Sequence, residues 1–334
     1  MLTKKNKVLL INPTIYPEGV HRLEEEAELV YAPDGKPETL KKILSQGVNA
    51  VVVRLEEISE GIIKSGKDLK VIGVNGAGFS CVDIDAATKA GICVVNVVGA
   101  NSYTVAEHIV MFTLAMARNI KRADWAVRSG DWSFRDTHTV HDIHGYTFFS
   151  VGFGNIGKEV CRIMKYAFNM QVYVYDPFFS KEEIEKYGYI KVDDFSSGAS
   201  HADYISLHLP YNQHTYHFIN KESIQKIKKS SKIINCARGP IVDYDSLCDA
   251  LESGHLEMAG IDVYPEEPVS PTHRIFTLDN VIASPHCAGD TVESRTRIAI
   301  SVAEDILSVL RGERPRCFVN PKVEVINPKL FSNI

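Results

Sequence analysis

The sequence predicts an α/β protein of two domains, each built on a parallel sheet covered by helices. First, its 334 residues are enough for about two domains with separate cores. Second, short β-prone runs alternate with helical or turn-like stretches in both halves of the chain. Third, residues 148–176 combine a strand, a glycine-rich turn, a helix and a second strand, which together form a βαβ unit.

Composition and charge narrow the classes of function. The chain is 45% hydrophobic and 24% charged, which is ordinary for a globular protein. Its net charge of −5, with scattered Lys and Arg, indicates neither a nucleic-acid-binding nor a membrane-binding surface. No apolar stretch is long enough to span a membrane, and the apolar run Val8 to Ile11 favours a first strand over a signal sequence. The seven cysteines form neither a CxxC pair nor a Cys/His cluster, so we expect a reduced, cytoplasmic protein without a structural metal.

The first part of the chain alternates between β-rich and helical segments. The predicted strands are 7–11, 28–31, 50–53, 70–74 and 92–95, and the stretches between them include 38–47 and 60–67. A long helix is predicted from about Thr104 to Ser129, with an apolar face formed by Val105, Ile109, Phe112 and Met116. Residues 130–146 have no clear period, so we predict a loop there.

The glycine-rich segment predicts dinucleotide binding. Gly152 suits the tight turn, Gly154 allows backbone to approach a pyrophosphate, and Gly157 allows the helix to pack on the sheet. The helix N-terminus then offers unpaired amides to the phosphates. Asp176 follows 19 positions after Gly157, where its carboxylate can accept hydrogen bonds from the adenosine ribose and repel a 2′-phosphate. The cofactor is therefore predicted to be NAD, in preference to NADP.

Alternation resumes after this segment. Strands are predicted within 172–176, 204–209, 232–237, 258–264 and 280–285, with helices near 181–187, 221–228, 244–253 and 291–311. We expect a dinucleotide-binding domain at 103–291, inserted between 1–102 and 292–334, which together form a substrate-binding domain. The periodicity leaves an alternative open, in which the helix at 291–311 caps the dinucleotide domain instead.

Three polar residues follow successive strands of the predicted dinucleotide domain. Ligands bind beyond the carboxyl ends of parallel strands, so these positions are candidates for chemistry. His286 suits proton transfer because imidazole titrates near neutrality. Arg238 suits a substrate carboxylate through its bidentate fork. Glu267 can hydrogen-bond His286 and fix its orientation. Alone, each of these residues is more commonly structural, but their shared position favours an alcohol or keto-acid oxidoreductase.

Three further histidines allow a different reading. His138, His141 and His144 recur at i, i+3 and i+6, a spacing that could hold a metal in a metal-dependent enzyme. No acid or cysteine is arranged to complete such a site, so we predict no metal and no catalytic role for them. Survival of activity under chelation would exclude the metal-dependent alternative.

Six stretches of the sequence resemble the D-isomer-specific 2-hydroxyacid dehydrogenase family. In chain order they are NSYTVAEH (101–108), VGFGNIG (151–157), ADYISLHLP (202–210), NCARGPIVD (235–243), AGIDVYPEEP (259–268) and SPHCAG (284–289). The resemblance implies two Rossmann-like domains with NAD in the cleft between them, commonly in a homodimer. It also implies that His286 is the acid/base, Glu267 its partner and Arg238 the substrate anchor.

The resemblance extends to binding residues. Cofactor contacts are implied for Thr104, Gly152, Gly154, Asn155, Ile156, Asp176, Leu209, Pro210, Thr215, Cys236, Ala237 and Asp262. Substrate contacts are implied for Arg54, the amides of Ala77 and Gly78, and Arg238. Related formate dehydrogenases carry Gln where this chain has Glu267, so the acid favours a hydroxyacid.

Departures from the family pattern bear on the substrate. Phosphoglycerate-type members usually carry Arg where Val74 stands, and lactate-type members usually carry Tyr where Ala100 aligns. We therefore expect a small 2-keto acid and its (R)-2-hydroxy acid, without a close match to either type. No regulatory domain follows residue 334, so serine feedback is not expected. Relatives of this fold also serve as NAD-sensing corepressors, and such a binding protein is the alternative function.

Overall fold

The chain folds into two compact α/β units. The computed structural model describes residues 5–11 and 15–332. One unit combines Met1–Asn101 with Asp290–Ile334 and is called the terminal unit here; the other, Ser102–Gly289, is called the central unit. Each contains a parallel sheet, as predicted. Among the described residues, no helix is both long enough and apolar enough to cross a membrane.

The terminal unit is built on a sheet that has five strands within the described part of the chain. The strand order is β2-β1-β3-β4-β5, and every neighbouring pair is parallel. All residues of β3, β4 and β5 are buried, as expected for strands covered on both faces. The strands are β1 (Asn6–Ile11), β2 (Ala27–Ala32), β3 (Ala50–Val53), β4 (Val71–Val74) and β5 (Cys93–Asn96).

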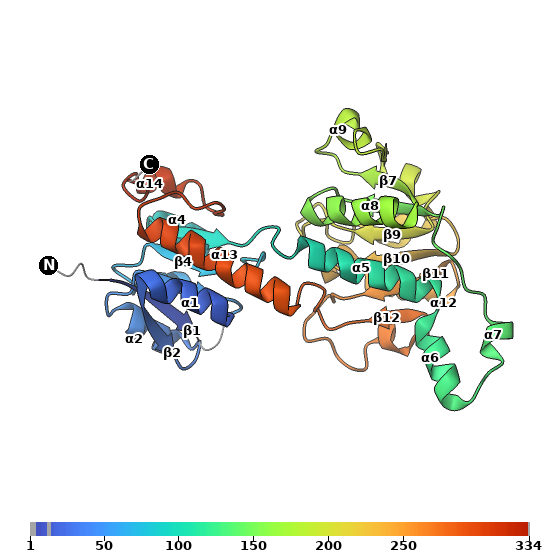
Figure 1. The fold of residues 1–334 in the computed structure, drawn as a ribbon, viewed down its shortest axis with the longest axis horizontal. Helices are drawn as coiled ribbons and strands as arrows, with labels where there is room; N and C mark the ends of the chain where they lie inside the picture. The colour runs from blue at the N-terminus through green and yellow to red at the C-terminus, as the bar shows by residue number, and fades with distance from the viewer. Residues whose placement is uncertain (1–4, 12–14, 333–334) are drawn as a thin grey trace. The chain divides into compact units, whose positions relative to one another are not determined.

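Helices from both ends of the chain cover this sheet (Figure 1). A helix near the N-terminus and the long C-terminal helix share an apolar cluster on one face, and three helices cover the other. A Cβ on Gly19 would meet the Ala299 carbonyl oxygen at 2.6 Å, so the two helix backbones pack closely there. The helices are α1 (Pro17–Glu26), α2 (Pro37–Leu44), α3 (Glu60–Ile63), α4 (Ile84–Lys89), α13 (Val292–Leu310) and α14 (Val323–Ile326). The helix predicted at 291–311 therefore packs in the terminal unit.

The central unit has a longer parallel sheet, with seven strands among the described residues. Their order is β12-β11-β10-β9-β6-β7-β8. The direction of strand order changes at β6, because β7 lies on one side of it and β9 on the other, which is the switch point where ligands bind in such sheets. The strands are β6 (Thr147–Val151), β7 (Gln171–Tyr175), β8 (Ile190–Lys191), β9 (Tyr204–Leu207), β10 (Ser231–Asn235), β11 (Leu256–Ile261) and β12 (Val281–Ala283).

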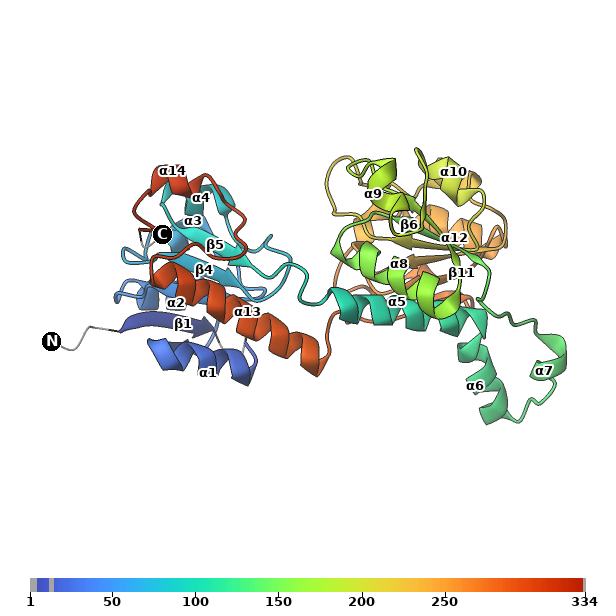
Figure 2. The same cartoon turned by 45° about the horizontal axis from the view of Figure 1, so that its top comes forward.

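Helices cover both faces of the central sheet. The pair α5 and α8 shares one apolar cluster with the sheet, and α10, α11 and α12 share another on the opposite face. By contrast, α6 and α7 extend away from the sheet in both ribbon views (Figures 1 and 2). The helices are α5 (Ser102–Ala117), α6 (Ile120–Ser129), α7 (Phe134–Thr137), α8 (Asn155–Phe168), α9 (Lys181–Glu185), α10 (Phe195–Ala199), α11 (Lys221–Gln225) and α12 (Tyr244–Glu252), with short 3₁₀ turns at Gly239–Ile241 and Arg274–Thr277.

The prediction of one helix from Thr104 to Ser129 was wrong. The segment forms two helices, which separate at Asn119, where φ is 45°. Asn tolerates this left-handed conformation better than most residues, so it can end a helix. The predicted apolar face through Met116 is buried against the sheet. Beyond it the chain leaves the sheet, and Ala126 is the only buried residue of α6.

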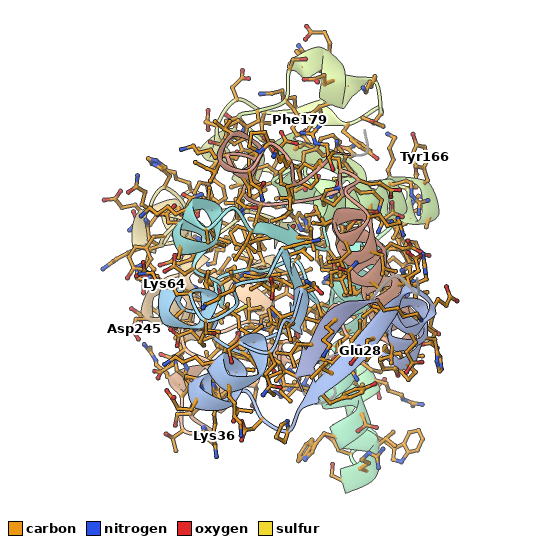
Figure 3. All side chains as sticks on the ribbon, turned by 90° about the vertical axis from the view of Figure 1, so that its left-hand side faces the viewer. Glu28, Lys36, Lys64, Tyr166, Phe179 and Asp245 are labelled. Carbon is orange, nitrogen blue, oxygen red and sulfur yellow. The ribbon has the colours of Figure 1, made fainter. Side chains whose placement is uncertain are left out.

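Smaller differences also have local causes. The predicted loop at 130–146 contains the four-residue helix α7, which is too short to show a period. Elements that the sequence analysis did not single out are α1, α4, β8, α10 and α14. Glu28, Lys36 and Lys64 are exposed on the outside of the terminal unit (Figure 3).

Candidate functional site

The glycine-rich turn between β6 and α8 leaves its middle open. A Cβ on Gly152, whose φ is 106°, would meet the His208 carbonyl oxygen at 2.7 Å, and a Cβ on Gly157 would meet the Gly152 oxygen at 2.4 Å. A Cβ on Gly154 would have no neighbour within 4 Å. The outer glycines are therefore required by packing, whereas the middle one borders open space. Gly154 and Asn155 are exposed at the start of α8, where the first helical amides have no intrahelical partner.

Asp176 lies directly beyond β7 and is held by two amides. It is 8% exposed. Its Oδ2 accepts a hydrogen bond from the Phe153 amide at 2.8 Å, and its Oδ1 accepts one from the Phe178 amide at 2.9 Å. A carboxylate has about four acceptor positions, so each oxygen can accept a further hydrogen bond. Asp176 is thus hydrogen-bonded to the glycine-rich turn itself, so the two lie close enough to contact one ligand.

His286 and Glu267 form a hydrogen-bonded pair. The Nδ1 of His286 lies 2.6 Å from Oε2 of Glu267, and the other carboxylate oxygen accepts the Tyr264 amide at 2.9 Å. An ionised carboxylate only accepts, so Nδ1 carries the proton and Nε2 is left for another partner. The His286 side chain is 49% exposed. Its backbone, at φ 52°, is held by a hydrogen bond that its amide donates to the Asp262 carbonyl at 2.7 Å.

Arg238 is presented by a tightly packed loop after β10. The preceding Asn235 accepts the Ala237 amide at 3.0 Å and donates to the Arg238 carbonyl at 3.0 Å. A Cβ on the following Gly239 would lie 1.8 Å from the Tyr264 carbonyl oxygen, so only glycine fits. The Arg238 side chain is exposed, and among the described residues no carboxylate lies within ion-pair distance of it. Its charge is therefore available to an anion.

Asp262 organises the loop that carries His286. It follows β11 and is 1% exposed. Its Oδ1 accepts the Ser284 hydroxyl at 2.5 Å and the Cys287 amide at 2.9 Å, and its Oδ2 accepts the Ala288 amide at 2.9 Å. One buried carboxylate thus binds the Ser284 side chain before His286 and two backbone amides after it.

The other residues implied as cofactor contacts lie in the same unit. Thr104 is buried in the first turn of α5. Leu209 and Pro210 follow β9, and the Thr215 hydroxyl donates to the Pro210 carbonyl at 2.6 Å. Cys236 and Ala237 follow β10 and are half-buried. Burial raises the pKa of the Cys236 thiol well above its ordinary value, so it is a neutral thiol at physiological pH.

The residues implied as substrate contacts in the terminal unit follow β3 and β4. Arg54 is 51% exposed, with its Nη2 3.9 Å from Asp290. Ala77 and Gly78 are exposed, and the buried Asn96 donates to the Ala77 carbonyl at 2.7 Å, which holds their loop. Val74 is fully buried, so the position that carries Arg in phosphoglycerate-type members offers no group to a ligand here.

The histidines of the α7 region are engaged separately. His138 stacks on Phe134 with ring centroids 4.2 Å apart, His141 lies 3.2 Å from the Tyr146 hydroxyl, and His144 lies 3.1 Å from the Asn169 amide. No group of three His, Cys, Asp or Glu that could hold a metal occurs among the residues that the structure describes.

Sequence reasoning missed four side chains at these strand ends. Asn96 donates to the Ala77 carbonyl and Asn235 to the Arg238 carbonyl. Each of these asparagines ends a strand, which is a signal that could have been used. The Ser284 hydroxyl donates a hydrogen bond to Asp262. His208 follows β9, and its buried Nε2 has no hydrogen-bond partner in the described part of the chain. Burial lowers the pKa of His208 to about 3, so this ring is neutral.

Comparison with known proteins assigns the chain to a family. Residues 110–288 match the model of the D-isomer specific 2-hydroxyacid dehydrogenase, NAD binding domain. The chain is 38% identical to D-3-phosphoglycerate dehydrogenase of Methanocaldococcus jannaschii over 94% of this chain and 59% of that protein. It is 32% identical to glyoxylate reductase of Korarchaeum cryptofilum over 94% of this chain and 96% of that protein.

A solved structure supports the likeness over the whole fold. The holo form of D-mandelate dehydrogenase from Rhodotorula graminis has a TM-score of 0.86 and 26% identity, with 95% of this chain and 98% of that chain covered. The chain spans 59%, 52% and 52% of the length of three D-3-phosphoglycerate dehydrogenases that it matches.

Proposed function

Because the chain belongs to the D-isomer specific 2-hydroxyacid dehydrogenase family, we propose that it interconverts a small 2-keto acid and its (R)-2-hydroxy acid with NAD. The observation that carries this proposal is the hydrogen-bonded pair of His286 and Glu267 at the same sheet edge as the glycine-rich turn. A proton-transfer group at the same sheet edge as a dinucleotide turn is the combination that hydroxyacid oxidation requires.

The residues of the central unit fit a bound dinucleotide. Gly154 borders open space, the α8 amides at Asn155 and Ile156 suit a pyrophosphate, and Asp176 has acceptor positions left for ribose hydroxyls. The unpartnered Nε2 of His208 adds a buried polar atom beside the same turn, which a ligand would satisfy. When bound, NADH supplies the hydride that reduces the keto carbon.

In this proposal the protein's own residues control protons and charge. Arg238 binds the substrate carboxylate and polarises the keto oxygen, because no protein carboxylate within the described residues neutralises it. Protonated His286, which carries a proton on each ring nitrogen, donates the Nε2 proton to the developing alkoxide during reduction, and neutral His286 accepts that proton at Nε2 during oxidation. Glu267 keeps the Nδ1 proton in place and stabilises the imidazolium.

We further propose that the substrate is not phosphorylated. The proteins similar to this chain include phosphoglycerate dehydrogenases and a glyoxylate reductase. Val74 is buried and apolar, so the terminal unit offers Arg54 but no cation at that position to a phosphate. A small keto acid such as glyoxylate or hydroxypyruvate therefore fits better than a phosphorylated one.

We also propose a homodimer, with a second copy covering α6 and α7. These helices extend from the central unit (Figure 2). Ile120 and Trp125 of α6 are 53% and 67% exposed, and Trp132, between α6 and α7, is 70% exposed. Single exposed apolar side chains are common, but several large ones on one projecting segment favour a protein interface. Light scattering should give twice the chain mass, and replacing Trp125 and Trp132 with Ser should produce monomer. A monomeric wild-type chain would contradict this proposal.

The activity is tested with NADH and a panel of keto acids at pH 6–7: glyoxylate, hydroxypyruvate, pyruvate, 2-ketoisocaproate and 3-phosphohydroxypyruvate. Turnover of one keto acid, with a loss of at least about a hundredfold in His286→Ala, supports the assignment of the proton donor. His138→Gln is the matched control and should retain full activity, as should wild type in chelator. Binding of NADH without turnover of any substrate would favour the NAD-sensing binding protein instead.

Cofactor preference requires its own comparison. Asp176→Asn removes the charge that repels a 2′-phosphate while keeping an amide oxygen for one backbone hydrogen bond. The ratio of kcat/KM with NADPH to that with NADH should rise about tenfold or more, since one charge interaction of roughly 1.4 kcal/mol corresponds to a factor of ten. Equal use of both cofactors by wild type would contradict the preference for NAD.

A further inference from the structure

A partly buried chain of hydrogen bonds links α5 to the loop that carries His286. The Nε2 of His108 lies 3.0 Å from the Ser284 hydroxyl, which lies 2.5 Å from Oδ1 of Asp262. The His108 side chain is 15% exposed, and its ring packs edge-on against Phe112 with centroids 4.7 Å apart. Neither His108 nor Ser284 has a role in the proposed mechanism.

The direction of the hydrogen bonds in this chain is determined by chemistry. An ionised Asp262 can only accept hydrogen bonds, so the Ser284 hydroxyl uses its one O–H to donate to that carboxylate. The Ser284 oxygen must then accept from His108, whose Nε2 carries the proton. Burial lowers the pKa of His108, and the negative charge of Asp262, 3.9 Å away, opposes that shift. The ring therefore acts as a neutral donor, oriented by Phe112 on one side and Ser284 on the other.

The position of His108 connects two parts of the central unit. Thr104, implied as a cofactor contact, lies four residues earlier on α5 and so on the same side of the helix. Asp262 is the last member of this series of hydrogen bonds. Its carboxylate accepts the Cys287 and Ala288 amides, and its backbone carbonyl accepts the His286 amide. A shift of α5 would therefore be transmitted to the backbone of the proton donor through three short contacts.

We propose that His108 and Ser284 are positioning residues, which hold Asp262 and, through it, the His286 loop in the geometry needed for proton transfer. This inference rests on the proposed function, since it assigns His286 the proton. The two residues act through Asp262 and neither one need touch substrate. The expected effect is moderate, because a 1 Å misplacement of a reacting group can cost about a hundredfold and partial loosening costs less.

The variants separate the hydrogen bonds from packing. His108→Phe keeps an aromatic ring but removes the donor, and His108→Gln restores an N–H near the position of Nε2. Ser284→Ala removes the middle link. Thr113→Val is the matched control, because it deletes a buried hydrogen bond on α5, from the Thr113 hydroxyl to the Ile109 carbonyl at 2.8 Å, that is not part of the chain.

With the keto acid that wild type reduces best, His108→Phe and Ser284→Ala should lower kcat about tenfold and narrow the pH range of kcat. In these two variants, KM, NADH affinity and melting temperature should stay near the wild-type values. His108→Gln should recover most of kcat, and Thr113→Val should keep the wild-type kcat. Unchanged kcat in both variants would overturn the inference. So would parallel loss of kcat, NADH binding and melting temperature without rescue by Gln, because that pattern indicates general damage.

A second measurement keeps the two proposals distinguishable. In full-length protein labelled with ¹⁵N-histidine, the His286 signals are assigned by their absence in His286→Gln. Wild type should show His286 protonated at Nδ1, and His108→Phe should shift or broaden those signals while Thr113→Val leaves them in place. If wild type reduces no keto acid, the proposed function fails, yet these spectra still decide whether His108 positions His286. Identical His286 spectra in wild type and His108→Phe would refute the positioning role.

Discussion

The two sheets present very different carboxyl edges. In the central unit, buried or half-buried polar side chains bind the backbone of the loops, as Asp176, Asn235 and Asp262 do. In the terminal unit, the loops after β3, β4 and β5 expose large apolar side chains, with Leu55 at 83%, Phe79 at 41% and Val98 at 53%. The central edge also exposes Phe178, and the terminal edge also has the buried Asn96, which binds the Ala77 carbonyl. The edges differ in that two buried carboxylates, Asp176 and Asp262, bind loop backbone in the central unit, whereas no buried carboxylate does so after the described strands of the terminal unit.

Under the proposed function, this difference favours a division of tasks. Proton transfer and cofactor orientation require groups held to within a fraction of an ångström, which a network of buried hydrogen bonds provides. Choice among keto acids depends on the substituent that the substrate carries, and exposed apolar side chains can discriminate by size with fewer fixed contacts. Changes in the central edge should therefore affect rate, and changes in the terminal edge should affect the choice of substrate.

The largest effect is expected from Gly239→Ala. The added Cβ would lie 1.8 Å from the Tyr264 carbonyl, so the backbone of the Arg238 loop must move. Overpacking of this kind costs roughly 1–3 kcal/mol or more, and activity should fall more than about a hundredfold. Activity and thermal unfolding are measured together. Gly254→Ala is the control, because its added Cβ would meet nothing within 4 Å and only the φ of 69° would strain the alanine. Full activity in Gly239→Ala would refute the packing argument.

A smaller effect, confined to cofactor binding, is expected from Gly154→Ala. The new methyl group has room in the free protein, so the melting temperature should not change. It would project into the space proposed for pyrophosphate, and NADH should bind about tenfold more weakly, or roughly 1.4 kcal/mol. Fluorescence titration with NADH measures this. Unaltered affinity would mean that the dinucleotide does not approach Gly154.

In the terminal unit, Arg54→Gln should change KM for keto acids more than kcat. The side chain is half exposed and paired only loosely with Asp290, so its contribution to substrate binding should be modest, about 1 kcal/mol or a five- to tenfold rise in KM. Steady-state kinetics with the best substrate tests this. Lys64→Gln removes another exposed cation of this unit and serves as the control. A fall in kcat alone would instead place Arg54 in the chemical step.

The smallest effect concerns the stability of the terminal unit. The Glu26 carboxylate forms ion pairs with Arg22 on α1 at 2.7 Å and with Arg311 beyond α13 at 3.0 Å. Both lower the pKa of Glu26, and the hydrogen bond from Arg22 has the larger effect. A lowered pKa stabilises the fold above the ordinary pKa of Glu, and this contribution is lost as pH falls through the lowered value.

Glu26→Gln should therefore lower the melting temperature by about one to three degrees at pH 7, because partly exposed ion pairs contribute little. The difference between variant and wild type should shrink as the pH falls below about 4. Glu38→Gln, which removes an exposed i,i+3 pair on α2, is the control. A melting difference that persists unchanged at acid pH would show that the charge of Glu26 is not responsible.

Local sequence signals predicted most of the fold and the chemistry. The strand runs and the three glycines lie within short windows, where periodicity and turn chemistry act over a few residues. The functional side chains could be proposed because they directly follow strands, and the pairing of His286 with Glu267 is present as expected. The end of the helix at Asn119 was missed because both flanking segments have helical propensity, and only the edge of the sheet distinguishes them.

The sequence by itself determined the βαβ unit, the two sets of parallel strands and the residues at their carboxyl ends, because each depends on neighbours in the chain. The tertiary structure alone decided that α13 packs against α1, and that His108 and Ser284, 176 positions apart, share a hydrogen bond. Contacts of this range leave no period or spacing in the sequence, because they are selected by the packing of whole elements rather than by local conformation.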